Sequence, residues 1–233
     1  MKKINAPVNL LVATILIIFA TFSACTKGNN NTPFIPITAG LKTNFGYKTG
    51  SYWIYKDSLS SETDSAYVDN YYLDSFYKGC VLYKGEPKYE GMNIFLKINN
   101  NNPADTERWN FHLEDSTFSI SLYNNLDSIE SRLNLTLFKY PFRLGDASNI
   151  SGCVPSYDIG SLTDIIPVIS LNNQNFSNAA RSNHANSTTG NTNVIYNDCF
   201  YVNMSAGIVK IIFDHPSSSV HRVLELQRYH IVR

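Results

Sequence analysis

Metal-binding or catalytic chemistry would need histidine, cysteine, serine or carboxylate side chains at characteristic spacings. Three of the five histidines, His215, His221 and His230, lie near the C-terminus. His221 and His230 are nine positions apart, and an odd separation places two residues on opposite faces of a regular strand. The sequence contains no His-Glu-x-x-His, Cys-x-x-Cys, Gly-x-Ser-x-Gly or glycine-rich phosphate loop. We therefore predict no metal, no cofactor and no catalytic residue.

The cysteines leave two arrangements open. Apart from Cys25, the chain contains Cys80, Cys153 and Cys199. Cys80 and Cys199 lie in segments typical of strands, where a free cysteine behaves as a small hydrophobic residue, whereas Cys153 lies between Gly152 and a proline-containing segment that favours a loop. Either a disulfide forms, for which we choose Cys153 and Cys199, or all three are buried thiols.

The N-terminus has the features of an export signal. Lys2 and Lys3 form a positive head, and residues 10–20 are an uncharged apolar run. This run is too short to span the roughly 30 Å hydrocarbon core of a bilayer. A positive head, a short apolar run and small residues after it are typical of a secretory signal peptide.

The end of this segment, Phe22-Ser23-Ala24-Cys25, resembles the lipobox of bacterial lipoproteins, which are cut before the cysteine and carry a diacylglycerol on its thiol. The resemblance implies that residues 1–24 are a cleaved signal peptide and that Cys25 is the lipid attachment site. Residues 25–40 then form the lipidated N-terminus and a flexible tether, attached permanently because two or more acyl chains give stable anchoring. Thr26 stands where an aspartate retains some lipoproteins at the inner membrane. We therefore expect an outer-membrane anchor. The stretch after Cys25 lacks an acidic run of the kind that resembles a surface-export signal, so we expect the domain to face the periplasm, with the cell surface as the alternative.

Composition limits the partners of the mature chain. Its 209 residues carry 17 Lys and Arg against 19 Asp and Glu, so no basic excess attracts nucleic acid. Charged residues are 16% of the whole chain, below the roughly 25% of typical domains. The length suits a single domain with a sizeable core.

Apolar residues recur with period two along most of the mature chain. Trp109, Phe111 and Leu113, for example, alternate with Arg108, Asn110 and His112, and such alternation is typical of antiparallel strands with one buried face. The segments predicted to be strands are residues 50–57, 64–71, 76–83, 92–98, 108–113, 117–123, 132–137, 194–204, 207–214 and 220–232.

Short turns between these segments predict hairpins, so neighbours in sequence should be neighbours in space. We predict a single all-β domain over residues 41–233, an antiparallel meander of roughly ten strands. The meander must form a sandwich or a curved, open or closed barrel to bury its apolar faces. No helix is predicted, and residues 172–193, with eight asparagines, are expected to form a long loop.

The outline resembles small uncharacterised lipoproteins of the Bacteroidota. The residues that carry the resemblance are Cys25, the opening segment Gly50-Ser-Tyr-Trp-Ile-Tyr, and the closing segments Phe200-Tyr-Val-Asn-Met-Ser-Ala-Gly-Ile-Val-Lys and Leu224-Glu-Leu-Gln-Arg-Tyr. The resemblance implies no catalytic residue. We expect a non-enzymatic binding or interaction module for an envelope ligand, whether glycan, peptide or lipid. The alternatives are a carrier of a small apolar ligand inside a barrel cavity and, less favoured, an enzyme.

Aspartate is followed by serine more often than composition predicts. Five of twelve aspartates show this, giving Ser58, Ser65, Ser75, Ser116 and Ser128 as the following residues. All but Ser75 are then followed by an aliphatic residue or threonine, which is similar to the O-glycosylation acceptor pattern of the Bacteroidota. The resemblance implies glycosylation at Ser58, Ser65, Ser116 or Ser128. The alternative is turn formation, because Asp and Ser both bond to nearby backbone groups at bends.

Overall fold

The computed structural model describes residues 32–77, 86–99, 108–124, 131–145, 147–148, 157–189, 192–215 and 220–233. The described elements in chain order are β1 (Phe34–Ile35), α2 (Ala39–Phe45), β2 (Tyr52–Asp57), β3 (Thr63–Phe76), β4 (Lys88–Asn99), β5 (Arg108–Glu114), β6 (Thr117–Asn124), β7 (Ser131–Lys139), β8 (Ala147–Ser148), β9 (Tyr157–Leu171), β10 (Gln174–Thr189), β11 (Thr192–Asn203), β12 (Gly207–His215) and β13 (Val220–His230).

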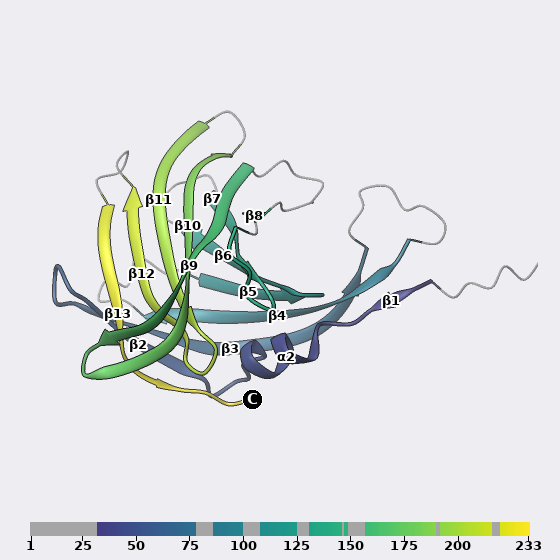
Figure 1. Ribbon diagram of the computed structural model, residues 1–233, viewed down its shortest axis with the longest axis horizontal. Coiled ribbons are helices and arrows are strands. Elements are labelled where there is room, and N and C mark those ends of the chain that lie inside the picture. The colour runs from purple at the N-terminus through teal and green to yellow at the C-terminus, as the bar shows by residue number, and fades with distance from the viewer. Residues whose placement is uncertain are drawn as a thin grey trace, which may run out of the picture.

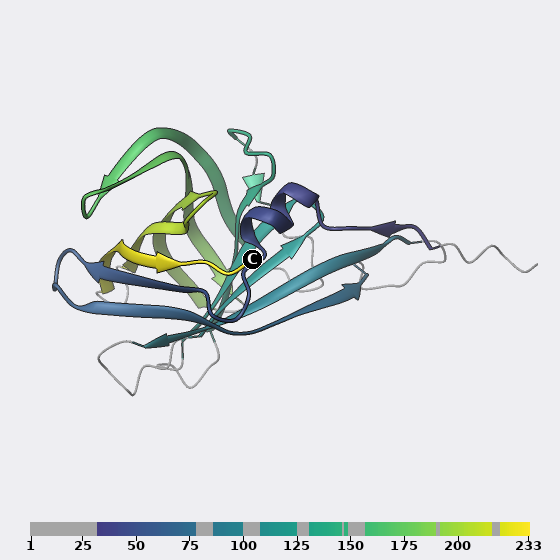
Figure 2. The ribbon, with the colours of Figure 1, turned by 90° about the horizontal axis from the view of Figure 1, so that it is seen from below.

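A single antiparallel sheet curves until it is nearly closed into a barrel (Figure 1 and Figure 2). Its strand order is β7-β6-β5-β4-β3-β2-β13-β12-β11-β10-β9-β8. The first long strand, β2, pairs with the last, β13, so that Trp53 lies opposite Tyr229. At the other end of the order, β7 contacts β9. The all-β antiparallel meander predicted from the sequence is confirmed, and its form is the curved barrel.

The alternation in the sequence becomes the two faces of the sheet. Along β2, Trp53, Tyr55 and Asp57 are buried, while the residues between them are partly exposed. The buried set continues across the barrel with Phe111, Phe118 and many aliphatic side chains, most of them at most 2% exposed. Burial of side chains of this size contributes about 1.5–3 kcal/mol each. The interior of the described barrel is therefore occupied by side chains.

The short helix α2 was not predicted. Leu41 and Phe45 are buried, and the ring of Phe45 lies 5.0 Å from Phe118 and 5.1 Å from Phe138. Seven residues give too short a periodic pattern to distinguish from a loop, so the helix depends on tertiary packing. The tether predicted over residues 25–40 must also be shortened, because β1 pairs with β4 and Ile37 lies in the core.

The loop predicted over residues 172–193 is wrong, because residues 174–189 form strand β10 and residues 192–193 begin strand β11. β10 pairs with β9 on one side and β11 on the other. Asn172 and Asn173 both have positive φ, and two such residues form the tight turn that suits a hairpin. Asn175 and Asn183, which also suggest a loop by residue type, are instead paired within the sheet.

Gly207 begins β12, and two features of its position require a glycine. Its φ is +81°, and a Cβ there would lie 2.6 Å from Tyr47 Oη and 3.2 Å from Trp53 Nε1. The indole N–H of Trp53 donates to the carbonyl of Ala206 at 2.7 Å. Gly207 thus lets the β11–β12 turn pack closely against the aromatic core.

The outer ends of β3 and β4 extend beyond the barrel, with β1 alongside, and together they form what we call the arm (Figure 1 and Figure 2). The arm comprises residues 34–35, 73–77 and 88–92. Phe34 pairs in parallel with Lys88, and Phe76 pairs with Tyr89 on the other side of β4. No helix of the described residues is long and apolar enough to cross a membrane.

Candidate functional site

A β-bulge interrupts the register of β3 between Val68 and Asn70. Before it, Asp64, Ala66 and Val68 are buried in regular alternation. At the bulge, Asp69 and Asn70 are both exposed, because the extra residue shifts the alternation by one. Bulges re-aim side chains and are frequent beside functional sites. Here the bulge gives the outer face of β3 two adjacent polar side chains.

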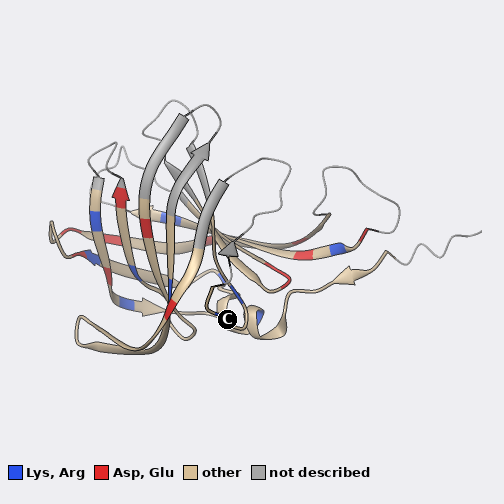
Figure 3. Ribbon diagram, turned by 45° about the horizontal axis from the view of Figure 1, so that its top comes forward, with Lys and Arg blue, Asp and Glu red and all other residues tan. Residues whose placement is uncertain are grey.

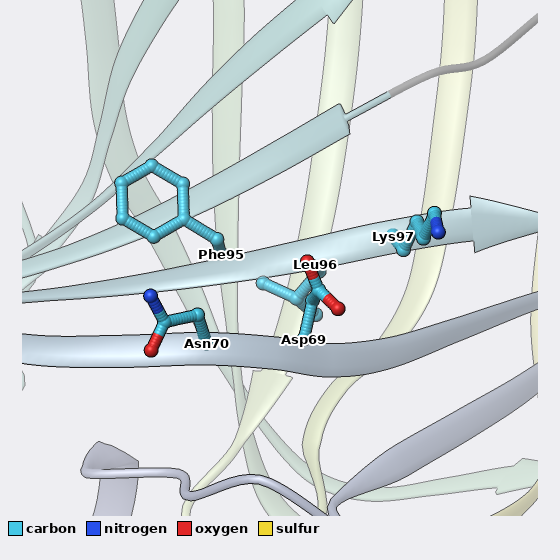
Figure 4. A pocket seen from close by; sticks show the side chains of 5 residues that line it. All are labelled: Asp69, Asn70, Phe95, Leu96 and Lys97. Carbon is cyan, nitrogen blue, oxygen red and sulfur yellow. The ribbon is translucent and has the colours of Figure 1, made fainter.

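A pocket of about 250 Å³ opens at this bulge, lined by Asp69, Asn70, Phe95, Leu96 and Lys97. Figure 4 shows the ring of Phe95 and the amide of Asn70 on one side of Asp69, with Lys97 on the other. Phe95 and Lys97 are two positions apart on β4 and so share a face. The pocket combines an aromatic ring with a carboxylate, an amide and an ammonium group, which accept and donate hydrogen bonds.

Aromatic rings extend from the pocket along the outer face toward the arm. Tyr72 stacks on Phe95, with ring centroids 5.6 Å apart and planes inclined by 25°. Tyr72 is 43% exposed. Further out, Phe76 lies 5.7 Å from His112, over Gly91, where a Cβ would come within 2.7 Å of Phe76. The missing side chain of Gly91 therefore allows the ring to lie against the sheet.

Polar groups of β4 and β5 lie on the same outer face. Nδ1 of His112 is 3.0 Å from Asn93 Oδ1, and its Nε2 is 3.5 Å from Glu114 Oε2. Asn110, which pairs with Phe95, is 5% exposed. Its Oδ1 accepts no hydrogen bond from any residue that the structure describes. A buried acceptor of this kind is uncommon, and it adds a polar position behind the pocket.

A second polar group of residues lies inside the barrel, and sequence reasoning missed it. Ser182 Oγ and His184 Nε2 are 2.8 Å apart, and His184 lies opposite Asp198 on β11. These residue types resemble a nucleophile with its base and carboxylate. However, Ser182, His184 and Asp198 are each only 1% exposed. The hydrogen bond between Ser182 and His184 satisfies two buried polar groups. Sequence reasoning missed this group because Ser182 and His184 lie on one strand and Asp198 on the next, and this spacing matches no known sequence motif.

An ion-pair network lies at the same end of the barrel interior. Arg222 contacts Asp57 at 3.3 Å and Asp64 at 2.7 Å. On β12, Phe213 is the pairing partner of Arg222. The backbone N–H of the next residue, Asp214, donates a hydrogen bond to the carboxylate of Asp198 at 3.2 Å. Polar and charged side chains thus occupy this end of the interior together with the rings of Phe200 and Phe213.

The predicted modification sites fall in different places. Ser58 is exposed in the β2–β3 turn. Ser65 lies within β3, paired with Ile54 and Asn99. Ser116 is half-buried in the two-residue turn between β5 and β6, where its carbonyl accepts a hydrogen bond from Tyr140 N–H. Ser128 lies outside the described residues, as does the lipid attachment site Cys25.

The predicted disulfide is not tested, because Cys153 lies outside the described residues, as does Cys80. Cys199 is buried in β11. Burial raises the pKa of its thiol, and the nearby Arg181 guanidinium opposes this only in part. The thiol is therefore held in its less reactive, protonated form.

His221 and His230 do not come together in the structure. His221 lies 3.4 Å from Asp214, whereas the ring of His230, at the other end of β13, lies 5.8 Å from that of Tyr52. Among the described residues no three His, Cys, Asp or Glu side chains form a cluster suited to a metal ion.

Comparison with known proteins shows only distant structural similarity. No protein-family model matches the sequence, and no curated protein matches it either. Among solved structures, the chain is similar to a protein from Bacteroides fragilis that is assigned as exported, with a YmcC-like fold. The TM-score is 0.45 at 11% identity, covering 79% of this chain and 97% of the other. It is also similar to a protein from Parabacteroides distasonis assigned as a lipoprotein, with a TM-score of 0.39 at 11% identity, covering 79% of this chain and 96% of the other. Similarity at this level establishes neither a family nor a function.

Proposed function

We propose that the protein is a lipid-anchored, non-enzymatic binding module of the bacterial cell envelope, which binds a glycan in the pocket at the β3 bulge. The observation that carries the proposal is the grouping of Asp69, Asn70 and Lys97 around the ring of Phe95. The lipobox at Cys25 supports the anchor, and Thr26 after it supports the outer membrane. The lack of an acidic run in residues 26–32 supports a domain that faces the periplasm.

The packing of the barrel favours a ligand on the surface. Trp53, Tyr55 and Phe111 fill the interior and are at most 2% exposed. Cavities that enclose small molecules usually measure about 300–1,000 Å³, and the pocket at the bulge, of about 250 Å³, opens on the outer face. The alternative, a carrier of an apolar ligand inside the barrel, is therefore less well supported.

The chemistry of the pocket suits a sugar. A pyranose ring has one face rich in C–H groups, which packs against the negative face of an aromatic ring, and a rim of hydroxyl groups. Phe95 offers the ring, and Asp69, Asn70 and Lys97 offer donors and acceptors at its edge.

Charge supports this choice of partner. Figure 3 shows basic and acidic residues interspersed along the described strands. Nucleic acid binding depends on a basic face that displaces counterions, so we propose no nucleic acid partner. The membrane, reached through Cys25, is the other partner that we propose.

The test is a glycan array of bacterial envelope oligosaccharides, followed by calorimetric titration of the best binder. Phe95→Ser and Asp69→Ala should each weaken binding about tenfold, equivalent to about 1.4 kcal/mol. Phe34→Ser, the same change at an exposed phenylalanine outside the pocket, is the control. Binding that survives both pocket substitutions, or no binding to any oligosaccharide, contradicts the proposal.

A further inference from the structure

Three large exposed hydrophobic side chains, Phe34, Leu73 and Tyr77, lie in the arm. The described residues include seven such side chains: Phe34, Leu59, Tyr72, Leu73, Tyr77, Leu144 and Val168. Four of these, Phe34, Tyr72, Leu73 and Tyr77, lie in β1, in β3 or directly after β3. Single exposed hydrophobic residues are ordinary on a protein surface, but a group of them marks an interaction site.

Three of these four share one face of the arm. Leu73 pairs with Met92 of β4, so their side chains lie on the same face of the sheet. Tyr77 lies four positions after Leu73, and an even separation along a strand keeps it on that face. The ammonium group of Lys88 lies 6.0 Å from the centre of the Tyr77 ring. Phe34 in turn pairs with Lys88. Phe34, Leu73 and Tyr77 therefore form one surface, which we call the arm patch, with exposed fractions of 56%, 52% and 38%.

The arm patch continues the face that α2 covers nearer the barrel. Met92 is 4% exposed, and its sulfur lies 3.6 Å from the position that a Cβ on Gly46 would occupy, just after the helix. Lys42 of α2 pairs with Glu90 at 2.7 Å. On the same face, Leu73, the partner of Met92 in β3, and Tyr77 are exposed. Tyr72 and the pocket at the β3 bulge lie on the opposite face.

The chain that leads to Cys25 leaves the structure beside the arm patch. Thr32, the first residue described, lies seven residues after Cys25, and seven extended residues span at most about 25 Å. Phe34 follows two residues later. A lipid anchor on Cys25 therefore holds β1 and the arm close to the bilayer surface.

We propose that the arm patch lies on the bilayer that carries the lipid anchor, with Phe34, Leu73 and Tyr77 in the interfacial layer. This inference rests on the proposed lipidation of Cys25. Tyrosine is enriched at the membrane–water interface because its ring is apolar and its hydroxyl stays hydrated. Lys88, beside Tyr77, has a long apolar stem that allows its ammonium group to reach the headgroups. The domain then presents its glycan pocket on the face of the sheet that points away from the lipid.

The inference can be tested with the lipidated mature protein reconstituted into phosphatidylcholine and phosphatidylethanolamine vesicles. Brominated lipids quench tryptophan emission only at short range. The substitution Tyr77→Trp places a tryptophan in the arm patch. As the control, Leu59→Trp places one in the β2–β3 turn, where Leu59 is 58% exposed. Trp53 and Trp109, both buried, give the same background in each variant.

We expect brominated lipid to quench a large part of the tryptophan emission added by Tyr77→Trp and to leave that added by Leu59→Trp unchanged. Adding Leu73→Glu to the Tyr77→Trp protein should abolish the quenching, and adding Leu59→Glu should not. Circular dichroism confirms that each variant is folded.

Equal quenching at the two positions in protein that floats with the vesicles overturns the inference. Failure of the wild type to float contradicts the lipid anchor itself. A dimer of the soluble Cys25→Ala protein that Leu73→Glu dissociates would assign the arm patch to a second copy and also overturn the inference.

Discussion

The guanidinium group of Arg222, on the last strand, donates from Nη2 to Asp64 Oδ2 at 2.7 Å, joining residues 158 positions apart. Its Nε contacts Asp57 Oδ2 at 3.3 Å. Both aspartates are buried, Asp57 at 2% exposure and Asp64 at 4%. Arg222→Leu would leave two neighbouring buried carboxylates without this cation. We expect the free energy of unfolding to fall by about 3 kcal/mol, measured by urea denaturation. An unchanged value would show that the network contributes little.

The two carboxylates of this network should affect acid stability in opposite ways. Burial raises the pKa of Asp57, but N–H groups of Leu59 and Val223 and the Arg222 side chain outweigh it, so the pKa is lowered overall. Burial, assisted by repulsion from Asp57 and Glu62, raises the pKa of Asp64 despite Arg222. The stabilisation from Asp57 is present above its ordinary pKa of 3.8 and is lost as the pH falls through the lowered value. That from Asp64 is present below 3.8 and is lost as the pH rises through the raised value.

Urea denaturation as a function of pH separates these contributions. Asp57→Asn should make the loss of stability below about pH 4 shallower than in the wild type. Asp64→Asn should remove the part of the stability that increases as the pH falls from neutral toward 4. Parallel pH profiles for the wild type and both variants would contradict the assignment.

Tyr47 and Tyr55 are two buried tyrosines with different surroundings. The hydroxyl of Tyr55 donates to the carbonyl of Ile208 at 2.9 Å, whereas Tyr47 Oη has no hydrogen-bond partner among the described residues. Burial raises the pKa of both hydroxyls, so neither ionises near neutral pH. We expect Tyr47→Phe to raise the free energy of unfolding by about 1 kcal/mol and Tyr55→Phe to lower it by about the same amount. Equal effects of the two changes would show that Tyr47 Oη is satisfied in solution.

Period-two alternation predicted the β-strands well, because each strand has one buried face. The segments around Trp53, Phe111 and Ile208 lie in strands β2, β5 and β12 as expected. Residues 172–193 were misread because the inward side chains of β10 include Ser182 and His184, which give no apolar alternation although both are buried. Tertiary pairing with two neighbouring strands decided that segment.

The candidate site could be predicted only in part. The sequence predicts a binding module without naming its binding residues, and the exposed ring of Tyr72, stacked on Phe95, suits such a module. The bulge at Asp69 was not predictable, because a shift of one residue in the register leaves no mark in a segment of mixed polarity. Nor could the network of Arg222 be foreseen, since its partners lie on strands that meet only when the barrel forms.

The lipid anchor makes a direct prediction. Cys25→Ala removes the thiol that carries the diacylglycerol, so the protein should lose its label from a radioactive fatty acid. An uncleaved precursor or a soluble form should accumulate instead. Cys199→Ala, which changes a buried thiol of the barrel, is the control and should keep the label. Equal label in the Cys25→Ala variant and the wild type would exclude Cys25 as the attachment site.

Glycosylation of the Asp-Ser pairs is the last prediction, and the structure changes what each site can contribute. Asp64 has a structural role in the ion pair with Arg222, which explains that residue without a sugar. Ser65 is half-buried between two paired strands, whereas Ser58 is exposed in a turn. We therefore expect Ser58 to be the most accessible of the described acceptors. Ser116 and Ser128 remain predicted O-glycosylation sites.

Protein from its native host should show discrete sugar increments above the mass of the lipidated 209-residue chain. Ser58→Ala should remove one increment and leave stability nearly unchanged, since the Ser58 hydroxyl makes only a long, exposed hydrogen bond of 3.4 Å to Val223. Ser116→Ala can lower stability by up to about 1 kcal/mol through a lost local hydrogen bond, so only a change of mass counts as support. Protein made in a host without the glycosylation machinery gives the reference mass. If the native protein has that same mass, the Asp-Ser pairs serve turns and the ion pair alone.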